Sequence, residues 1–236
     1  MKTKNEFELG PDRLILLAKP DRFSDDAIDI ARRLFGQRLE VFQGRAGEAF
    51  PVSPEDEFGN PCVISFLSPW IVPTWLVERS AIAINFHPGS RQYPGIGCYN
   101  FAIYEEAKTY GVVCHHMEST VDTGDIVAES LFPMMEDEKV ETLKFRSMIS
   151  MIDLFAQVLE LIRTGEALPK ADFGWSRKPF TRRELEELCV VEVGMDDDEI
   201  SRRTRAVTYP GYPGIRYRRP DGTLGPNKIA EGSPIA

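Results

Sequence analysis

The sequence has no surplus of positive charge and no long apolar run. Its 236 residues carry 28 Lys and Arg against 37 Asp and Glu, a formal net charge of −9, and such an acidic chain is poorly suited to hold a polyanion by bulk electrostatics. We therefore expect no nucleic-acid partner. No window approaches the roughly 20 apolar residues that cross a bilayer, and the charged residues 1–6 are not followed by an apolar signal-peptide core. These features predict a cytoplasmic protein without a membrane partner.

Paired cysteines are also missing. The four cysteines lie far apart and form no CxxC pair, at Cys62, Cys98, Cys114 and Cys189. This spacing supports neither a zinc knuckle nor a disulfide framework. We expect reduced, structural cysteines and no bound metal.

What is present is ordinary globular composition, with 42% hydrophobic and 28% charged residues. Short apolar runs predict strands at residues 13–18, 39–42, 62–67 and 81–86. Apolar residues at helical spacing after Ser24 predict a helix behind the first strand. Strands that alternate with helices favour an α/β fold built on a doubly wound, mostly parallel sheet.

The second half of the chain changes character at Leu168. Before it, the pattern predicts a helix over 99–108, strands at 111–114 and 126–132, and the longest helix over 140–162. After it come basic and aromatic residues, a predicted helix near 196–206 and a turn-rich segment. We expect a main domain over residues 1–168 and a small C-terminal α+β appendage over 169–236, made of a helix and a hairpin, with a mobile tail from Gly222.

Two polar side chains lie at the end of the fourth predicted strand. Asn85 and His87 are two residues apart and so lie on the same side of an extended segment, just before a loop rich in Pro and Gly. Loops at the carboxyl ends of parallel strands are where such sheets bind ligands. Further on, Asp122 and Asp125 flank a Gly turn, and only the fold can bring these pieces together.

In chain order, Asn85-x-His87-Pro88, Tyr93-Pro94-Gly95, a helix, Tyr110-Gly111-Val112 and the turn over residues 122–126 resemble the pattern of the 10-formyltetrahydrofolate-dependent formyltransferases. The resemblance covers residues 60–165 well and 10–60 only by strand pattern. It implies a Rossmann-like formyltransferase domain over residues 1–168, with 10-formyltetrahydrofolate as formyl donor. It also implies that Asn85, His87 and Asp122 are the catalytic residues.

The chemistry of formyl transfer needs these residue types. An amine that attacks a formyl carbon creates an oxyanion, which the Asn85 amide and an N–H of His87 stabilise. The carboxylate of Asp122 beside His87 fixes the imidazole tautomer, raises its basicity and collects the proton of the attacking ammonium.

The resemblance also implies binding residues. The segment 66–71 is similar to the one whose backbone meets the pterin ring, and residues 118–122 resemble the loop that covers it. The cofactor-binding residues implied are Ser68, Trp70, Ile71, Glu118 and Val121. Trp70 is unusual at its position, where packing beside the pocket is the alternative. For the acceptor we expect contacts from Gly89, Tyr93, Asn100, Arg177 and Tyr209.

Several residues have two readings. Adjacent histidines on a strand point to opposite faces, so for His115 and His116 we favour packing and hydrogen bonding over a metal site. Asp125 either caps its turn or touches substrate. Asn100 either starts a helix or contacts the acceptor. Clusters of basic residues such as those near Arg177 most often form a solvent-exposed surface. Arg177, next to Trp175, is the one residue among them that we expect to contact the ligand.

The resemblance narrows the acceptor. Enzymes acting on initiator methionyl-tRNA carry a large basic C-terminal barrel, for which this acidic chain leaves little room, and those acting on glycinamide ribonucleotide lack such an appendage. The segments 175–179 and 203–214 are similar to sugar N-formyltransferases. We therefore expect a nucleotide-linked dideoxy amino sugar, used for surface polysaccharide such as the O-antigen of lipopolysaccharide. The segment 89–92 departs from the family's common Ser-Leu-Leu-Pro, which makes the acceptor mouth unusual.

Two other functions stay open from the sequence. One is formyl transfer to an amino-acid-type or other small amine. The other is a folate-binding protein without turnover, against which the intact set of Asn85, His87 and Asp122 argues. A homodimer is compatible with the sequence, which leaves the oligomeric state open.

Overall fold

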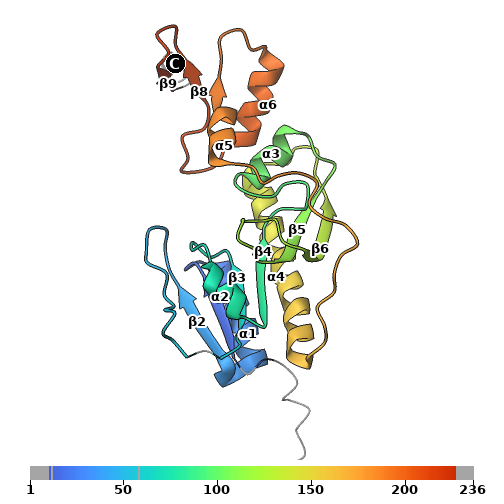
Figure 1. Ribbon diagram of the computed structural model, residues 1–236. Coiled ribbons are helices and arrows are strands. Elements are labelled where there is room, and N and C mark those ends of the chain that lie inside the picture. The colour runs from blue at the N-terminus through green and yellow to red at the C-terminus, as the bar shows by residue number, and fades with distance from the viewer. Residues whose placement is uncertain (1–10, 12, 58, 227–236) are drawn as a thin grey trace, which may run out of the picture.

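The computed structural model describes residues 11, 13–57 and 59–226 (Figure 1). Its centre is a six-stranded sheet with the order β2-β1-β3-β4-β5-β6. The strands are β1 (Leu14–Ala18), β2 (Leu39–Gln43), β3 (Cys62–Phe66), β4 (Ile82–His87), β5 (Thr109–His116) and β6 (Ile126–Pro133). The helices of this part are α1 (Arg22–Phe35), the short 3-10 helix η2 (Gly36–Arg38), α2 (Thr74–Arg79), α3 (Cys98–Tyr104) and α4 (Val140–Thr164).

The sheet is mostly parallel, as the alternation of strands and helices predicts. β1 pairs in parallel with β2 and β3, and β3 pairs in parallel with β4. β5 then runs antiparallel to both β4 and β6. The carboxyl ends of the four parallel strands therefore lie at one edge, where α/β sheets bind ligands.

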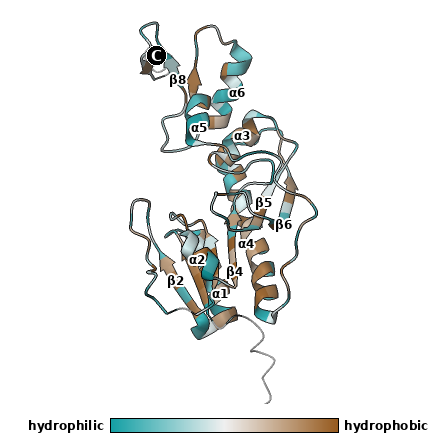
Figure 2. Ribbon diagram, in the orientation of Figure 1, coloured by the Kyte–Doolittle hydropathy of each residue, from teal (hydrophilic) through white to brown (hydrophobic). Residues whose placement is uncertain are grey.

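β1 is apolar throughout because both faces of the sheet are covered. Leu14 and Leu16 face a cluster that includes residues of α1 and α4, while Ile15 and Leu17 face a second cluster that includes Leu76 of α2. Strands buried on both faces read as continuous hydrophobic runs rather than alternating ones. Figure 2 shows the same distribution, with brown strands in the centre and teal on outer helices.

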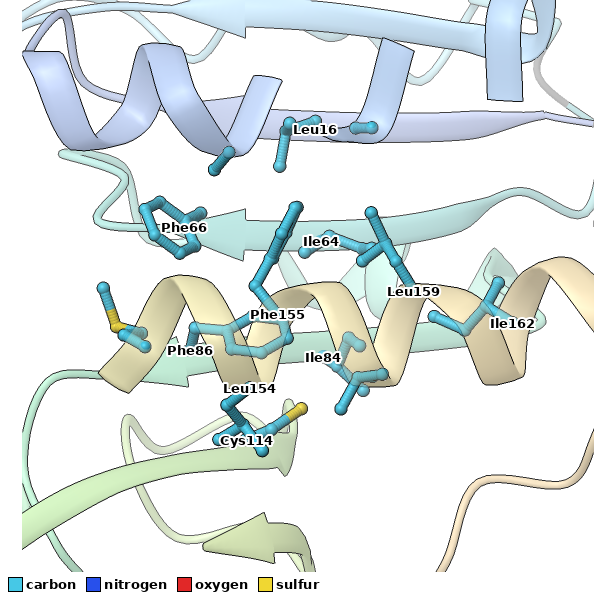
Figure 3. Packing of buried hydrophobic residues seen from close by; sticks show 14 of the residues in the cluster. Leu16, Ile64, Phe66, Ile84, Phe86, Cys114, Leu154, Phe155, Leu159 and Ile162 are labelled. Atoms are coloured by element: carbon cyan, nitrogen blue, oxygen red, sulfur yellow. The ribbon is translucent and has the colours of Figure 1, made fainter. Parts of the chain in front are cut away.

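An aromatic group anchors α4 to the sheet. The Phe155 ring lies 5.1 Å from the rings of both Phe66 on β3 and Phe86 on β4, in edge-to-face geometry (Figure 3). Such pairs add about 0.5–1.5 kcal/mol to the burial of their area. Phe86 is thereby fixed with its side chain toward α4, and its neighbours Asn85 and His87 face the other way, as the alternation of side chains along a strand requires.

One helix is shorter than the sequence pattern predicts. The helix expected over 99–108 ends at Tyr104. Glu106 has a φ of 53°, in the left-handed region that breaks a right-handed helix. The chain turns there and enters β5 at Thr109, so residues 105–108 form the connection instead of a last helical turn.

Residues from α5 (Arg182–Leu188) onward form a smaller unit at one end of the molecule (Figure 1). It contains α5, α6 (Asp197–Val207) and a three-stranded sheet of β7 (Val190–Val191), β8 (Arg216–Arg218) and β9 (Leu224–Gly225). α6 packs on α3, where the Asn100 amide donates to the carbonyl oxygen of Ala206 at 2.7 Å. The domain boundary at residue 168 stays a prediction. Of the tail expected to be mobile, residues 227–236 lie outside the described residues.

A strap, defined here as residues 170–180, links α4 to α5 and runs back along the sheet (Figure 1). Its backbone is pinned at both ends, by a bond from Ala171 N to the Ile126 carbonyl and by one from Phe180 N to the Pro94 carbonyl, each 2.9 Å long. The strap therefore passes between β6 and the loop that follows β4. Within the described part of the chain, no helix is both long and apolar enough to span a membrane.

Candidate active site

The expected catalytic residues meet at the ends of β4 and β5. Asn85 and His87 lie on β4, two residues apart and on one side of the strand. Asp122 lies in the turn between β5 and β6, with its side chain buried. One of its carboxylate oxygens, Oδ2, lies 3.2 Å from Nδ1 of His87, and the Asn85 amide donates to the other, Oδ1, at 3.5 Å. Residues 37 positions apart in sequence are thus brought into contact.

A fourth residue joins this cluster. His115 on β5 stands directly opposite Asn85 in the strand pairing. Its Nε2 lies 3.2 Å from Oδ1 of Asp122 and 3.1 Å from the Asn85 amide nitrogen. The expectation that His115 and His116 point to opposite faces leaves room for one of them to reach the cluster. The strand register, which the sequence does not reveal, decides that it is His115.

The geometry around Asp122 depends on a tight turn. Asp122 itself has a φ of 52°, and Asp is one of the few residues that tolerate this region. At Gly124 a Cβ atom would stand 2.0 Å from the carbonyl oxygen of His116, so only glycine fits there. Gly95, from the loop after β4, donates its N–H to Oδ2 of Asp122 at 2.9 Å. The turn and the loop together fix the carboxylate.

Asp122 is ionised at neutral pH. Burial alone raises the pKa of its carboxyl, but the neighbouring His87, His115 and the Gly95 N–H outweigh burial and lower this pKa to about 2. For His87 the balance is reversed. Burial, the largest influence, lowers the pKa of its imidazole, against the opposing charge of Asp122. The pKa values of both groups are thus lowered, and perturbed pKa values in a cleft are typical of functional sites.

Both nitrogens of His87 face oxygen atoms that can only accept a hydrogen bond. Nδ1 faces the Asp122 carboxylate, and Nε2 lies 2.9 Å from the carbonyl oxygen of Tyr93. Only the doubly protonated ring would satisfy both contacts, whereas burial opposes its charge. The ring is therefore poised to take up a proton that arrives from outside and to stabilise it between two acceptors.

A cleft of about 270 Å³ opens above the cluster. Asn85, His87, His115 and Asp122 all line it. The other walls come from the segment after β3 and the turn after β5, and they include all the expected cofactor-binding residues: Ser68, Trp70, Ile71, Glu118 and Val121. The side chains of Ile71 and Val121 are 75% and 51% exposed, which leaves apolar surface open at the cleft for a flat ring system to cover.

Trp70 both lines the cleft and packs beside it. Its indole N–H donates to the carbonyl oxygen of Glu48 at 3.0 Å. Its ring occupies the space next to Gly44, where a Cβ atom would stand 2.1 Å from a ring carbon. The two readings of Trp70 from the sequence are therefore combined in the structure.

Two of the expected acceptor residues lie behind His87 rather than in the cleft. At Gly89 a Cβ atom would stand 2.6 Å from Nε2 of His87, so this glycine lets the loop pass close to the imidazole. Tyr93 is buried and contacts the same nitrogen through its backbone carbonyl. Both residues shape the position of His87 in this structure.

The remaining three lie away from the cluster. Asn100 and Tyr209 line a second cleft, of about 520 Å³, between α3, α4 and the segment after α6. Arg177 stacks on the Phe180 ring at 3.3 Å and pairs with Glu105 and Glu184. The structure does not bring these side chains to the residues that carry the chemistry, and their contacts with an acceptor stay a prediction.

The described residues contain no group of three or more His, Cys, Asp or Glu side chains arranged to hold a metal ion. His115 is committed to Asp122 and to the carbonyl oxygen of His116, which lies 2.7 Å from its Nδ1. The polar side chains that line the site include amide, imidazole and carboxylate groups.

Comparisons with known proteins find formyltransferases among the sequences and structures similar to this chain. No established protein-family profile matches the chain. The methionyl-tRNA formyltransferase of Streptococcus pyogenes is 31% identical over 152 residues, which are 64% of this chain and 49% of that protein. The chain thus spans about half of the length of this relative.

Solved structures share the fold over most of the chain. A sugar N-formyltransferase from Shewanella superposes with a TM-score of 0.72 at 18% identity, covering 90% of this chain and 95% of that one. An N-formyltransferase from Helicobacter canadensis, solved with folinic acid and dTDP-3-aminofucose, gives a TM-score of 0.67 at 17% identity, with 86% and 83% covered. The chain is thus similar in sequence to a methionyl-tRNA formyltransferase over part of that protein's length, and it shares the fold of solved N-formyltransferases.

Proposed function

We propose that the protein transfers a formyl group from 10-formyltetrahydrofolate to the amino group of a nucleotide-linked dideoxy amino sugar. The observation that carries the chemistry is the meeting of Asn85, His87 and Asp122 at one cleft. Amide donor, imidazole and ionised carboxylate are the groups that acyl transfer to an amine requires. A cytoplasmic setting, a role in surface polysaccharide synthesis and a homodimer belong to the same proposal.

The cleft suits a folate. Its walls offer the backbone of residues 67–72 and 117–122 together with apolar side chains, among them Ile71 and Val121. Flat heteroaromatic rings are held by this combination, because apolar walls cover the faces while backbone groups bond the polar edge. The Helicobacter relative is described with folinic acid bound, which supports the same choice of donor here. Bound 10-formyltetrahydrofolate supplies the formyl carbon.

The residues then have distinct tasks. The Asn85 amide donates a hydrogen bond to the formyl oxygen as negative charge develops there. The carboxylate of Asp122, which lines the cleft, takes the proton of the attacking amine and passes it to Nδ1 of neutral His87, whose Nε2–H donates to the Tyr93 carbonyl oxygen. The proton then returns through Asp122 to the departing nitrogen. His115 and Gly95 hold the Asp122 carboxylate in place throughout.

The choice of acceptor rests on three observations. The chain is acidic, with a net charge of −9, which disfavours a tRNA. The segments 175–179 and 203–214 resemble sugar N-formyltransferases, and the chain covers most of two structures described as N-formyltransferases, one from Shewanella that acts on sugars and one solved with dTDP-3-aminofucose. A diphosphate needs only a few donors, which local arginines supply despite the negative overall charge.

The deciding experiment incubates the protein with 10-formyltetrahydrofolate and one acceptor at a time, namely dTDP- and UDP-linked amino sugars, methionyl-tRNA, glycinamide ribonucleotide and free amino acids. Tetrahydrofolate release and product mass are followed. We expect formylation of a nucleotide amino sugar only. Formylation of methionyl-tRNA or of a free amino acid, with every nucleotide amino sugar inert, would reject the acceptor and retain the chemistry. No transfer to any amine, with folate still bound, would favour a folate-binding protein.

A further inference from the structure

The indole ring of Trp175, in the middle of the strap, lies against both histidines of the candidate active site. Its ring centroid lies 5.2 Å from that of His115 and 5.9 Å from that of His87, with interplanar angles of 80° and 75°. Edge-to-face pairs at such distances are attractive and fix the relative orientation of the rings. One side chain from the strap therefore packs against an imidazole of β4 and against one of β5.

The polar edge of the same indole reaches the turn that carries the carboxylate. The Nε1–H of Trp175 donates to the carbonyl oxygen of Gly124 at 2.9 Å, two residues beyond Asp122. Because Asp122 has a positive φ, its turn needs support from outside. Trp175 thus contacts all three pieces of chain that supply the acid-base groups.

The strap that presents Trp175 is itself held on both sides of it. Ala171 N bonds the Ile126 carbonyl at 2.9 Å, and Ser176 N bonds the Arg91 carbonyl at 3.1 Å. These bonds join the strap to β6 and to the loop after β4. Trp175 does not line the cleft, so it covers the histidines from outside the space where ligand binds.

We propose that Trp175 is a positioning residue, which holds His87, His115 and the Asp122 turn in their working geometry and keeps water from the side of the imidazoles that faces away from the cleft. The expected effect on kinetics rests on the formyl transfer proposed above, whereas the expected change in the pKa of His87 does not. Since burial is the largest influence on the pKa of His87 and lowers it, removal of a covering ring should raise that pKa. The titratable groups that act on His87 are Asp122, which raises its pKa, and His115, which lowers it. Trp175 carries no charge, so its replacement removes neither of these groups and changes the burial of His87.

The test measures the pKa of His87 by NMR titration of the imidazole signals in the ligand-free protein, in wild type and in Trp175→Ala. We expect the pKa to rise toward the ordinary value of 6.5 in Trp175→Ala. In Trp175→Phe, which keeps a ring but lacks the N–H, we expect a smaller rise. Should Trp175→Ala fail to fold, Trp175→Phe carries the test. A pKa equal to wild type in the folded variants would overturn the proposal.

A kinetic readout accompanies the titration. We expect kcat/KM of Trp175→Ala to fall about 10- to 100-fold, because a catalytic group displaced by about 1 Å loses on this scale. The acidic limb of its pH profile should move to higher pH, with folate binding unchanged because Trp175 does not line the cleft.

Trp75→Ala is the matched control, since Trp75 packs in a cluster with Leu76 and contacts Arg79. It should leave the His87 pKa unchanged, and an equal shift in Trp75→Ala would mean a general loss of stability and reject the assignment. A pKa shift in Trp175→Ala without any transferase activity in wild type would retain this inference and reject the proposed function.

Discussion

Asn85 and His115 stand opposite each other on β4 and β5, and the amide nitrogen of Asn85 lies 3.1 Å from Nε2 of His115. This contact couples the proposed oxyanion donor to the network around Asp122. His115 is therefore part of the candidate active site, although its sequence context marks it only as one of two adjacent histidines.

His115→Ala should lower turnover by about 10- to 100-fold, because the imidazole that contacts both Asn85 and Asp122 is lost and the catalytic geometry loosens. Steady-state kinetics with a nucleotide amino sugar measures this. His116→Ala is the control, since His116 is the next residue but does not line the cleft. We expect its turnover to change less than about threefold, because the side chain is polar and lies away from the reacting groups. Equal effects of the two replacements would contradict the role of His115.

Each of Asn85→Ala, His87→Ala and Asp122→Ala should lower turnover by at least about 100-fold while the fold survives. Pairwise combinations should lose little more, because residues that act as a unit are strongly non-additive. Circular dichroism verifies folding and product mass verifies turnover. Asp125→Ala, an exposed carboxylate in the same turn that pairs with Lys170, is the control. Wild-type turnover in any one of the three variants would remove the mechanism.

Stability should decrease in acid in two steps. His87 has a folded-state pKa lowered by burial, so protonation favours the unfolded chain. The stability that it contributes is full above the unfolded value of 6.5 and is lost as pH falls from there through the folded value. The pKa of Asp122 is lowered from 3.8 to about 2, so its contribution is present above 3.8 and is lost as pH falls through 2. Urea unfolding between pH 8 and pH 2 measures both steps.

In Asp122→Asn the acid-most step of that series should shrink, because the group that titrates below pH 3.8 is gone. Asp125→Asn serves as comparison. The same loss of stability between pH 3.8 and 2 in Asp122→Asn as in wild type would show that other carboxylates dominate this range.

Chelators should leave activity unchanged. The described residues hold no group of three metal-ligating side chains, and amide, imidazole and carboxylate suffice for the proposed proton transfer and oxyanion stabilisation. Turnover with and without EDTA is the measurement. Inhibition by EDTA that zinc reverses would show that His115 and its neighbours serve a metal after all.

Asn100→Ala should destabilise the fold by about 1–3 kcal/mol, because the Ala206 carbonyl on α6 loses its donor. Thermal unfolding measures the loss, and kcat/KM of the folded protein should stay near wild type. The opposite result, unchanged stability with a raised KM for the acceptor, would favour the other reading of Asn100 as an acceptor contact.

The local pattern alone determined much of this protein. The apolar runs of β1, β3 and β4 are continuous because a parallel sheet covered on both faces excludes water from both sides of each strand. Asn85 and His87 share one side because side chains alternate along a strand, and Gly124 marks a turn that a Cβ would block. Each of these features leaves a local signal in the sequence, as an apolar run, an alternation or a glycine, so the sequence is sufficient to predict them.

Tertiary structure decided which distant residues share a site. The contact of His115 with Asn85 depends on the register between β4 and β5, and the contact of Trp175 with both histidines depends on how the strap returns along the sheet. The positions of Asn100 at α6 and of Arg177 on Phe180, apart from the catalytic cluster, were set the same way. Such contacts arise from the packing of elements that are far apart in sequence. The hydrophobic pattern predicts each helix or strand separately, but how these elements are placed relative to one another is decided only when the core packs.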